Sequence, residues 1–105
     1  MNTIIVKILE SDQHSAPAKL ADAEIHFAGG ELDGLKLVGF AVWRKRDGNG
    51  QNVSFPSRQF TVHGERRTFS LLRWVAERTA RDRLADVVLQ AYRQNQQDPD
   101  GNSAR

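Results

Sequence analysis

The chain has no cysteine, only three prolines and no long apolar run. Because thiolates are absent, neither a disulfide framework nor a cysteine-based zinc site can form. No apolar stretch approaches the roughly 18 residues of a membrane-spanning helix, so we expect no contact with a membrane. Residues 1–9 lack the basic leader and the small-residue cleavage site of a signal peptide, and their β-branched content favours a strand. These features predict a cytoplasmic protein.

Length and composition indicate one globular domain. The chain has 105 residues, of which 39% are hydrophobic and 27% charged. These values are ordinary for a folded domain, and the length leaves no room for a second independent core. We expect residues 1–95 to form the domain and residues 96–105 to be a flexible polar tail.

The charged residues are distributed unevenly along the chain. The formal net charge of the whole chain is only +2. Residues 1–35 have a net charge of −4, residues 36–93 of +7, and residues 94–105 of −1. Most of the positive excess lies in residues 36–72, at +5, with +2 in residues 73–93. A strongly basic stretch within a small domain predicts a surface that faces an anionic partner.

Residues 1–69 show the pattern of antiparallel strands. Ala21, Ala23, Ile25 and Phe27 alternate with polar residues, which is typical of a strand with one buried face. Glycine-containing turns at 29–30, 33–34, 47–50 and 63–64 separate the apolar runs. We expect strands at residues 4–9, 20–28, 35–43, 53–55 and 66–69, joined as a meander.

The pattern changes to a helical period after residue 70. A helix beginning near residue 80 is predicted, because Thr79 and Asp82 have the spacing of a capping box. Its expected core stripe consists of Leu84, Val87, Val88, Ala91 and Tyr92. The apolar residues between 71 and 75 fit either a separate short turn or an extension of this helix. Together the patterns predict an α+β fold, with an antiparallel β-meander of about five strands followed by a C-terminal amphipathic helix.

Two features of this pattern favour a dimer. Leu89 lies about 140° from Leu84 at 100° per residue, and thus away from the expected stripe. A short sheet also has unpaired edges that another chain can cover. We therefore expect the helix to pack against a second copy of the chain.

The sequence gives little support for catalysis. His14, His26 and His63 are isolated, and none has a second ligand at metal-binding spacing. Asp22 and Glu24 point the same way from one strand and could hold a divalent cation, as in a metal-dependent nuclease. Such a pair is more often the solvated face of a strand. No glycine-rich loop precedes a helix in a phosphate-binding pattern. We expect no enzyme activity, metal, cofactor or small-molecule substrate.

Nucleic-acid binding has more support, because basic residues gather at the predicted strand ends. Arg44, Lys45 and Arg46 end the third strand, Arg58 follows Pro56, and Arg66 and Arg67 open the last strand. In a meander these ends can converge on one rim and contact phosphates. The alternative is a generic cationic surface. Trp43, beside the basic triplet, is a candidate for stacking on a base.

The predicted helix start adds further cations. Arg78, Arg81 and Arg83 lie where the helix dipole disfavours positive charge, which makes sense if a phosphate lies between them. Local ion pairs of Glu77 with Arg81 and of Arg78 with Asp82 are an equally simple explanation if the helix begins earlier.

Three segments, namely VSFPSR at 53–58, GERR at 64–67 and RDRLADVVLQAY at 81–92, follow one another along the chain. These segments and their order resemble the SpoVG family, a group of small bacterial proteins named for sporulation stage V and septation. The resemblance covers about residues 20–95. It implies a β-meander with a C-terminal helix, assembled as a homodimer that regulates by binding DNA, and in some members RNA. The basic residues that match by position are Arg58, Arg67, Arg81 and Arg83.

The sequence therefore predicts a small bacterial nucleic-acid-binding regulator that acts as a non-catalytic homodimer. The alternative is a dimeric interaction module whose basic surface meets an acidic protein. The predicted binding residues are Arg44, Lys45, Arg46, Arg58, Arg66, Arg67, Arg81 and Arg83.

Overall fold

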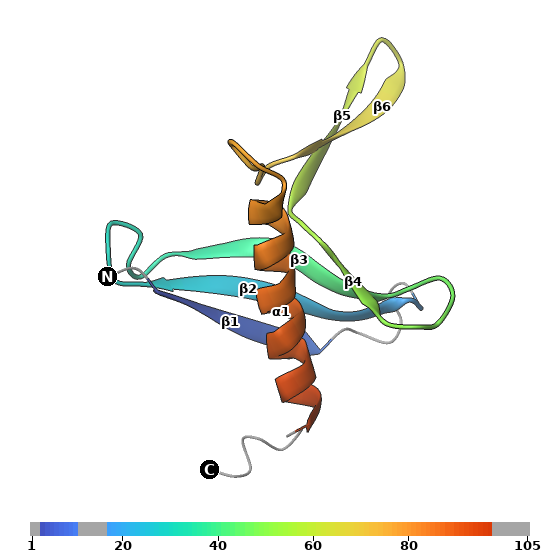
Figure 1. Ribbon diagram of the computed structural model, residues 1–105. Coiled ribbons are helices and arrows are strands. Elements are labelled where there is room, and N and C mark those ends of the chain that lie inside the picture. Colours follow the sequence, from blue (N-terminus) through green and yellow to red (C-terminus); the bar gives the residue numbers. More distant parts are fainter. Residues whose placement is uncertain (1–2, 11–16, 98–105) are drawn as a thin grey trace.

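A computed structural model describes residues 3–10 and 17–97 of the chain (Figure 1). In these residues it has an α+β fold, as predicted, with antiparallel strands and one C-terminal helix. The strands are β1 (Thr3–Glu10), β2 (Lys19–Ala28), β3 (Lys36–Arg44), β4 (Gln51–Ser54), β5 (Ser57–Val62) and β6 (Glu65–Ser70), and the helix is α1 (Thr79–Gln97). Residues 11–16, between the first two predicted strands, and residues 98–105 of the predicted tail lie outside the described residues.

The strands form two separate sheets. β1, β2, β3 and β4 pair in that order as a four-stranded antiparallel sheet, and β5 pairs only with β6. The β5–β6 hairpin projects away from the larger sheet (Figure 1). The antiparallel order is as predicted, but the single meander is divided, and β5 is a strand that the sequence patterns did not single out. Pro56 lies at the division because it has no N–H to donate to a ladder.

The division is fixed by close contacts around Pro56, which is buried. Gly39 of β3 has φ +110°, and a Cβ placed there would lie 2.9 Å from Cβ of Pro56. The amide of Leu71 donates to the carbonyl of Pro56 at 2.9 Å, just after β6 ends. Thus both ends of the hairpin are attached beside β3, and glycine at position 39 permits the close approach.

The core lies between the larger sheet and α1. Ala21, Ala23 and Ile25 of β2 are at most 2% exposed, so the predicted alternation in this strand is confirmed. Their small side chains leave space for α1, which crosses this face and contacts β1 and β4 (Figure 1). The other buried members of the core are Phe40, Val42, Val53 and Val88.

The helix begins at Thr79, close to the predicted start, and the residues from 71 to 78 are not helical. The predicted capping box is wrong. The hydroxyl of Thr79 bonds to Oε1 of Glu77 at 3.4 Å, while the carbonyl of Arg78 accepts from the amides of Arg81 and Asp82. The helix continues to Gln97, past the predicted domain boundary at residue 95.

The buried stripe of α1 is rotated about the helix axis relative to the predicted stripe. Val87 is 41% exposed, whereas Leu89 packs against the core. The stripe is centred on Val88. Ala85, Leu89 and Tyr92 flank Val88 on the helix surface, and Val87 points outward. Leu89 therefore carries no indication of a second chain. The residues packed around Val88 include Leu84, Ala85, Leu89 and Tyr92.

This rotation predicts different costs for two neighbouring valines. Val88→Ala should destabilise the protein by about 2–3 kcal/mol, because it removes fully buried methyl groups and leaves a cavity. Val87→Ala should change the stability by less than about 0.5 kcal/mol, since this side chain is exposed. Urea denaturation of both variants measures the difference. Equal losses would show that the helix face is assigned incorrectly.

Candidate nucleic-acid interface

The predicted cationic residues lie at the β3–β4 turn, on the β5–β6 hairpin and on α1, rather than on one rim. Arg44, Lys45 and Arg46 lie at the β3–β4 turn, while Arg66 and Arg67 lie at the β5–β6 turn. The two turns are at opposite ends of the chain segment 51–62, which spans up to roughly 35 Å when extended. Figure 1 shows the first turn beside the larger sheet and the second at the tip of the projecting hairpin. The predicted single rim is therefore wrong.

The register of the hairpin places aromatic and basic side chains together. Arg58 is opposite Phe69, and Phe60 is opposite Arg67. Since paired residues point to the same side, these four share one face. The rings of Phe60 and Phe69 are 4.7 Å apart between centroids. We name this surface the aromatic face of the hairpin; it consists of Arg58, Phe60, Val62, Glu65, Arg67 and Phe69.

A further arginine joins the aromatic face from the segment after β6. The guanidinium of Arg73 lies 5.6 Å from the ring centroid of Phe69, and its Nε donates to the carbonyl of Ser70 at 2.8 Å. The hydrogen bond and the cation–π contact hold Arg73 at the base of the hairpin. Sequence reasoning missed this residue, because its position depends on the non-helical course of residues 71–78.

The turn between β5 and β6 supports this arrangement. His63 and Gly64 both have positive φ, at +53° and +81°. Two such residues are typical of the tight turns whose twist matches paired strands, so the predicted turn is confirmed. Because successive residues of a strand point to opposite faces, Arg66 and Arg67 are separated. Arg66 lies on the polar face, with Gln59, Thr61 and Thr68.

The aromatic face keeps a positive charge. Glu65 is its single carboxylate, and Oε1 of Glu65 lies 3.2 Å from Nη2 of Arg67. Both side chains are exposed, and an exposed ion pair of this kind contributes little free energy. Arg67 can therefore exchange this partner for a phosphate at small cost.

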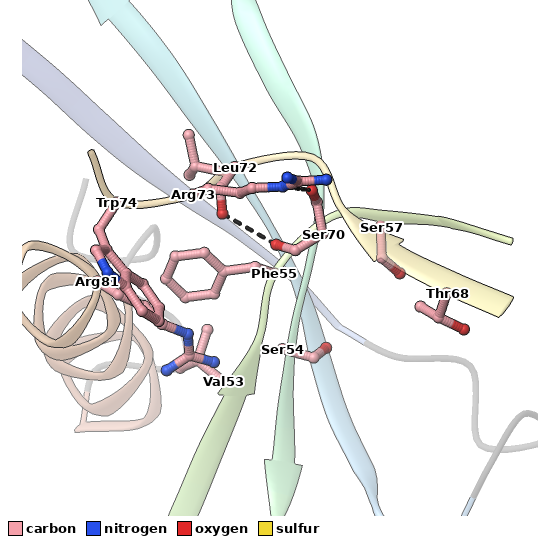
Figure 2. Close-up of a pocket in the computed structure, with 10 residues that line it drawn as sticks. All are labelled: Val53, Ser54, Phe55, Ser57, Thr68, Ser70, Leu72, Arg73, Trp74 and Arg81. Carbon is pink, nitrogen blue, oxygen red and sulfur yellow. Dashed lines mark hydrogen bonds between the residues drawn. The ribbon is translucent and has the colours of Figure 1, made fainter. Parts of the chain in front are cut away.

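A groove lies at the base of the hairpin, between β4, the segment 70–74 and α1 (Figure 2). Its volume is about 710 Å³. Arg81 and Trp74 border it on the helix side, and the guanidinium of Arg81 lies 4.6 Å from the ring centroid of Phe55. The structure thus brings Arg81 to the groove. Hydroxyl side chains of the β4–β5 and β6 segments form its opposite wall: Ser54, Ser57, Thr68 and Ser70.

Two of the three arginines predicted at the helix start, Arg81 and Arg83, are separated. Arg83 is exposed and lies two residues beyond Arg81, which is about 200° further around the helix. The proposed pair of Glu77 with Arg81 does not form, because Glu77 precedes the helix and bonds to Thr79. Arg81 instead stacks on Phe55, so local ion pairing does not explain its position.

Trp43 is half-buried rather than free to stack. Its Nε1 donates to the hydroxyl of Ser54 at 2.8 Å, across the β3–β4 pair. The rings that contact arginine side chains are those of Phe55 and Phe69. The alternation of arginine and phenylalanine in β5 and β6 is visible in the sequence and was the available signal for the aromatic face.

Asp22 and Glu24 lie on the face of β2 opposite the core, but each is engaged with a cation. Nζ of Lys19 is 2.6 Å from Asp22, and Nζ of Lys36 is 3.3 Å from Glu24. The pKa of the Glu24 carboxyl is lowered, chiefly by a hydrogen bond with His26 and also by Lys36. Desolvation of the carboxyl offsets this lowering only in part. Within residues 3–10 and 17–97, no three histidine or carboxylate side chains gather in a possible metal site.

The part of the chain that the structure describes contains no helix long and apolar enough to cross a membrane. Comparisons with protein-family models, with curated proteins and with solved structures find no match for this chain, so its function has to be argued from the geometry of the hairpin and the groove.

Proposed function

We propose that this chain is a small, SpoVG-like bacterial regulator that binds DNA, and also RNA, as a cytoplasmic homodimer without catalysing a reaction. The aromatic face of the hairpin is the observation that supports this function most. It combines two phenylalanine rings in tilted contact with Arg58 and Arg67, and Arg73 extends the positive charge at its base.

The chemistry of this face suits nucleic acid in two ways. Guanidinium groups bind phosphate oxygens through paired donors and keep their charge at all physiological pH values. Exposed aromatic rings stack on bases, which accounts for much of the affinity of sequence-tolerant single-strand binding. Phe69 is 45% exposed, so a base placed on it would cover apolar surface that now faces water.

The protruding shape also suits this function. A two-stranded hairpin is marginally stable by itself and has few contacts to lose when it adapts to a partner. Its two edges are open, and its strands extend beyond the larger sheet (Figure 1). The hairpin can therefore reach along a nucleic-acid backbone without steric conflict with the core.

An electrophoretic shift assay with duplex DNA, single-stranded DNA and RNA tests the proposal. We expect a shift at low salt that weakens as salt rises. Roughly five to eight phosphate contacts per dimer predict a slope of log affinity against log salt of about −3.5 to −7, depending on strandedness. The absence of a shift with all three probes would reject the function, and a monomer mass in light scattering at micromolar concentration would reject the dimer.

The second candidate is a dimeric interaction module for an acidic protein. Exposed apolar side chains beside the basic residues favour it, because Leu71, Trp74 and Val75 are 63%, 46% and 101% exposed. Polyglutamate binding without any nucleic-acid shift would support this candidate over the first. Binding of nucleic acid with the salt dependence given above would favour the first.

A further inference from the structure

We propose that the groove at the base of the hairpin binds one nucleotide unit, meaning an unpaired base joined through its sugar to a phosphate. The inference deepens the proposed function and rests on it where the unit belongs to a bound strand. A free mononucleotide has the same chemistry and is the other possible source. The groove, about 710 Å³, lies within the range of roughly 300–1,000 Å³ that is typical of small-molecule sites.

The charge of the groove favours an anion. Its lining contains Arg73 and Arg81 and no carboxylate. The ion pairs found among the described residues involve neither arginine. Each guanidinium is held by other contacts, Arg73 by the carbonyl of Ser70 and Arg81 by the ring of Phe55. Two positioned guanidinium groups without a neutralising carboxylate favour an anionic ligand such as a phosphate.

The aromatic wall of the groove favours a planar group. In Figure 2 the side chain of Trp74 lies beside Arg81, and Phe55 is between them and the hairpin. Trp74 is 46% exposed, although an indole is among the side chains that gain most from burial. It also lines an adjoining hollow of about 140 Å³ against the first turn of α1. An open indole next to two cations is a suitable platform for stacking a base.

The opposite wall supplies polar groups that a sugar or a base edge could use. Ser57 and Thr68 bring hydroxyls that can donate and accept hydrogen bonds. The hydroxyl of Ser70 is already oriented by its bond to the carbonyl of Leu72 at 3.0 Å. A base whose edge is paired in a duplex cannot use such groups, and its faces are covered by its neighbours. The groove therefore predicts a preference for an unpaired nucleotide.

The test follows the indole resonances of the full-length protein by NMR. The chain has two tryptophans, and Trp43→Phe identifies the signal of Trp74. The probes are UMP, AMP, inorganic phosphate, an oligothymidine single strand and a duplex of mixed sequence. We expect the Trp74 signal to move with the single strand and with millimolar mononucleotide, and to move far less with phosphate or duplex.

Affinity measurements on variants provide the second readout. Trp74→Leu should weaken single-strand binding by roughly 5- to 150-fold, which corresponds to the loss of one stacked base. Arg81→Gln should weaken it by roughly 10- to 150-fold, which corresponds to the loss of one charge-assisted phosphate contact. Arg93→Gln is the matched control, because it removes the same charge from an exposed position on the same helix, and it should change the affinity less than about threefold. Circular dichroism verifies the fold of each variant. If Trp74→Leu does not fold, the Trp74 signal of the unmodified protein still shows whether the groove binds a nucleotide.

The outcomes separate the two proposals. Strand binding that leaves the Trp74 signal unmoved, with equal affinities for Arg81→Gln and Arg93→Gln, would overturn the nucleotide groove and leave the proposed function intact. Movement with mononucleotides but no binding of any strand would support the groove and overturn the proposed function. No response to any probe would overturn both.

Discussion

Replacing Arg58, Arg67 and Arg73 together by glutamine should lower the affinity for single-stranded nucleic acid by roughly 30- to 1,000-fold at physiological salt. Each of these side chains lies on or beside the aromatic face, where it can contact a phosphate. A single-strand phosphate contact contributes about −0.7 to the slope of log affinity against log salt. Three lost contacts per protomer should therefore make the slope shallower by about 2 for each hairpin that is bound.

The β3–β4 turn offers a matched control for this experiment. Changing Arg44, Lys45 and Arg46 to glutamine removes the same charge from a turn that lies away from the hairpin (Figure 1). We expect this variant to lose less than about tenfold in affinity, because only the long-range electrostatic attraction between the protein and the nucleic acid is reduced. Equal losses in the two triple variants would show that net charge, rather than the aromatic face, determines binding.

Gly39→Ala should destabilise the protein by about 3–5 kcal/mol. Two costs add at this position. A residue with a Cβ is strained at positive φ, which costs on the order of 1–3 kcal/mol. The new methyl group would also lie 2.9 Å from Cβ and 3.3 Å from Cα of Pro56, and overpacking of that kind costs roughly 1–3 kcal/mol. Pro56 cannot rotate away, because its ring and its backbone both form the contact.

Gly48→Ala separates these two costs. Gly48 has φ +82°, and no atom lies within 4 Å of a Cβ built there. This variant carries the strain without the overlap and should lose only about 1–2 kcal/mol. Urea denaturation measures both. Similar losses for the two variants would show that the contact with Pro56 contributes nothing.

The sequence patterns predicted local features well. The alternation in β2 identified its buried residues, and the helix begins at Thr79, close to the predicted start near residue 80, although the capping box that suggested this start does not form. Both features depend on residues a few positions apart, so one segment contains the whole signal. The stripe of α1 was only partly predicted. Val87 and Leu89 are adjacent to Val88 on opposite sides, and the sheet decides which of them it covers.

Features that depend on distant residues were not predicted. Adjacency in the sequence suggested that Arg66 and Arg67 act together, but a strand places them on opposite faces. The approach of Gly39 to Pro56 joins β3 to the linker between β4 and β5, where the chain leaves the larger sheet. The groove is assembled from β4, β6, the segment 70–74 and α1, so no single motif contains it.

The separation of the hairpin from the core has an evolutionary consequence. None of the residues between Pro56 and Leu71 belongs to the hydrophobic cluster that α1 covers or packs against it. Under the function proposed above, mutations in β5 and β6 therefore alter what the protein recognises with little change in the stability of the domain. Selection can then act on recognition and on stability independently. A ribbon of the same length from another protein, inserted between Pro56 and Leu71, would be a direct way to redirect the scaffold to a new target.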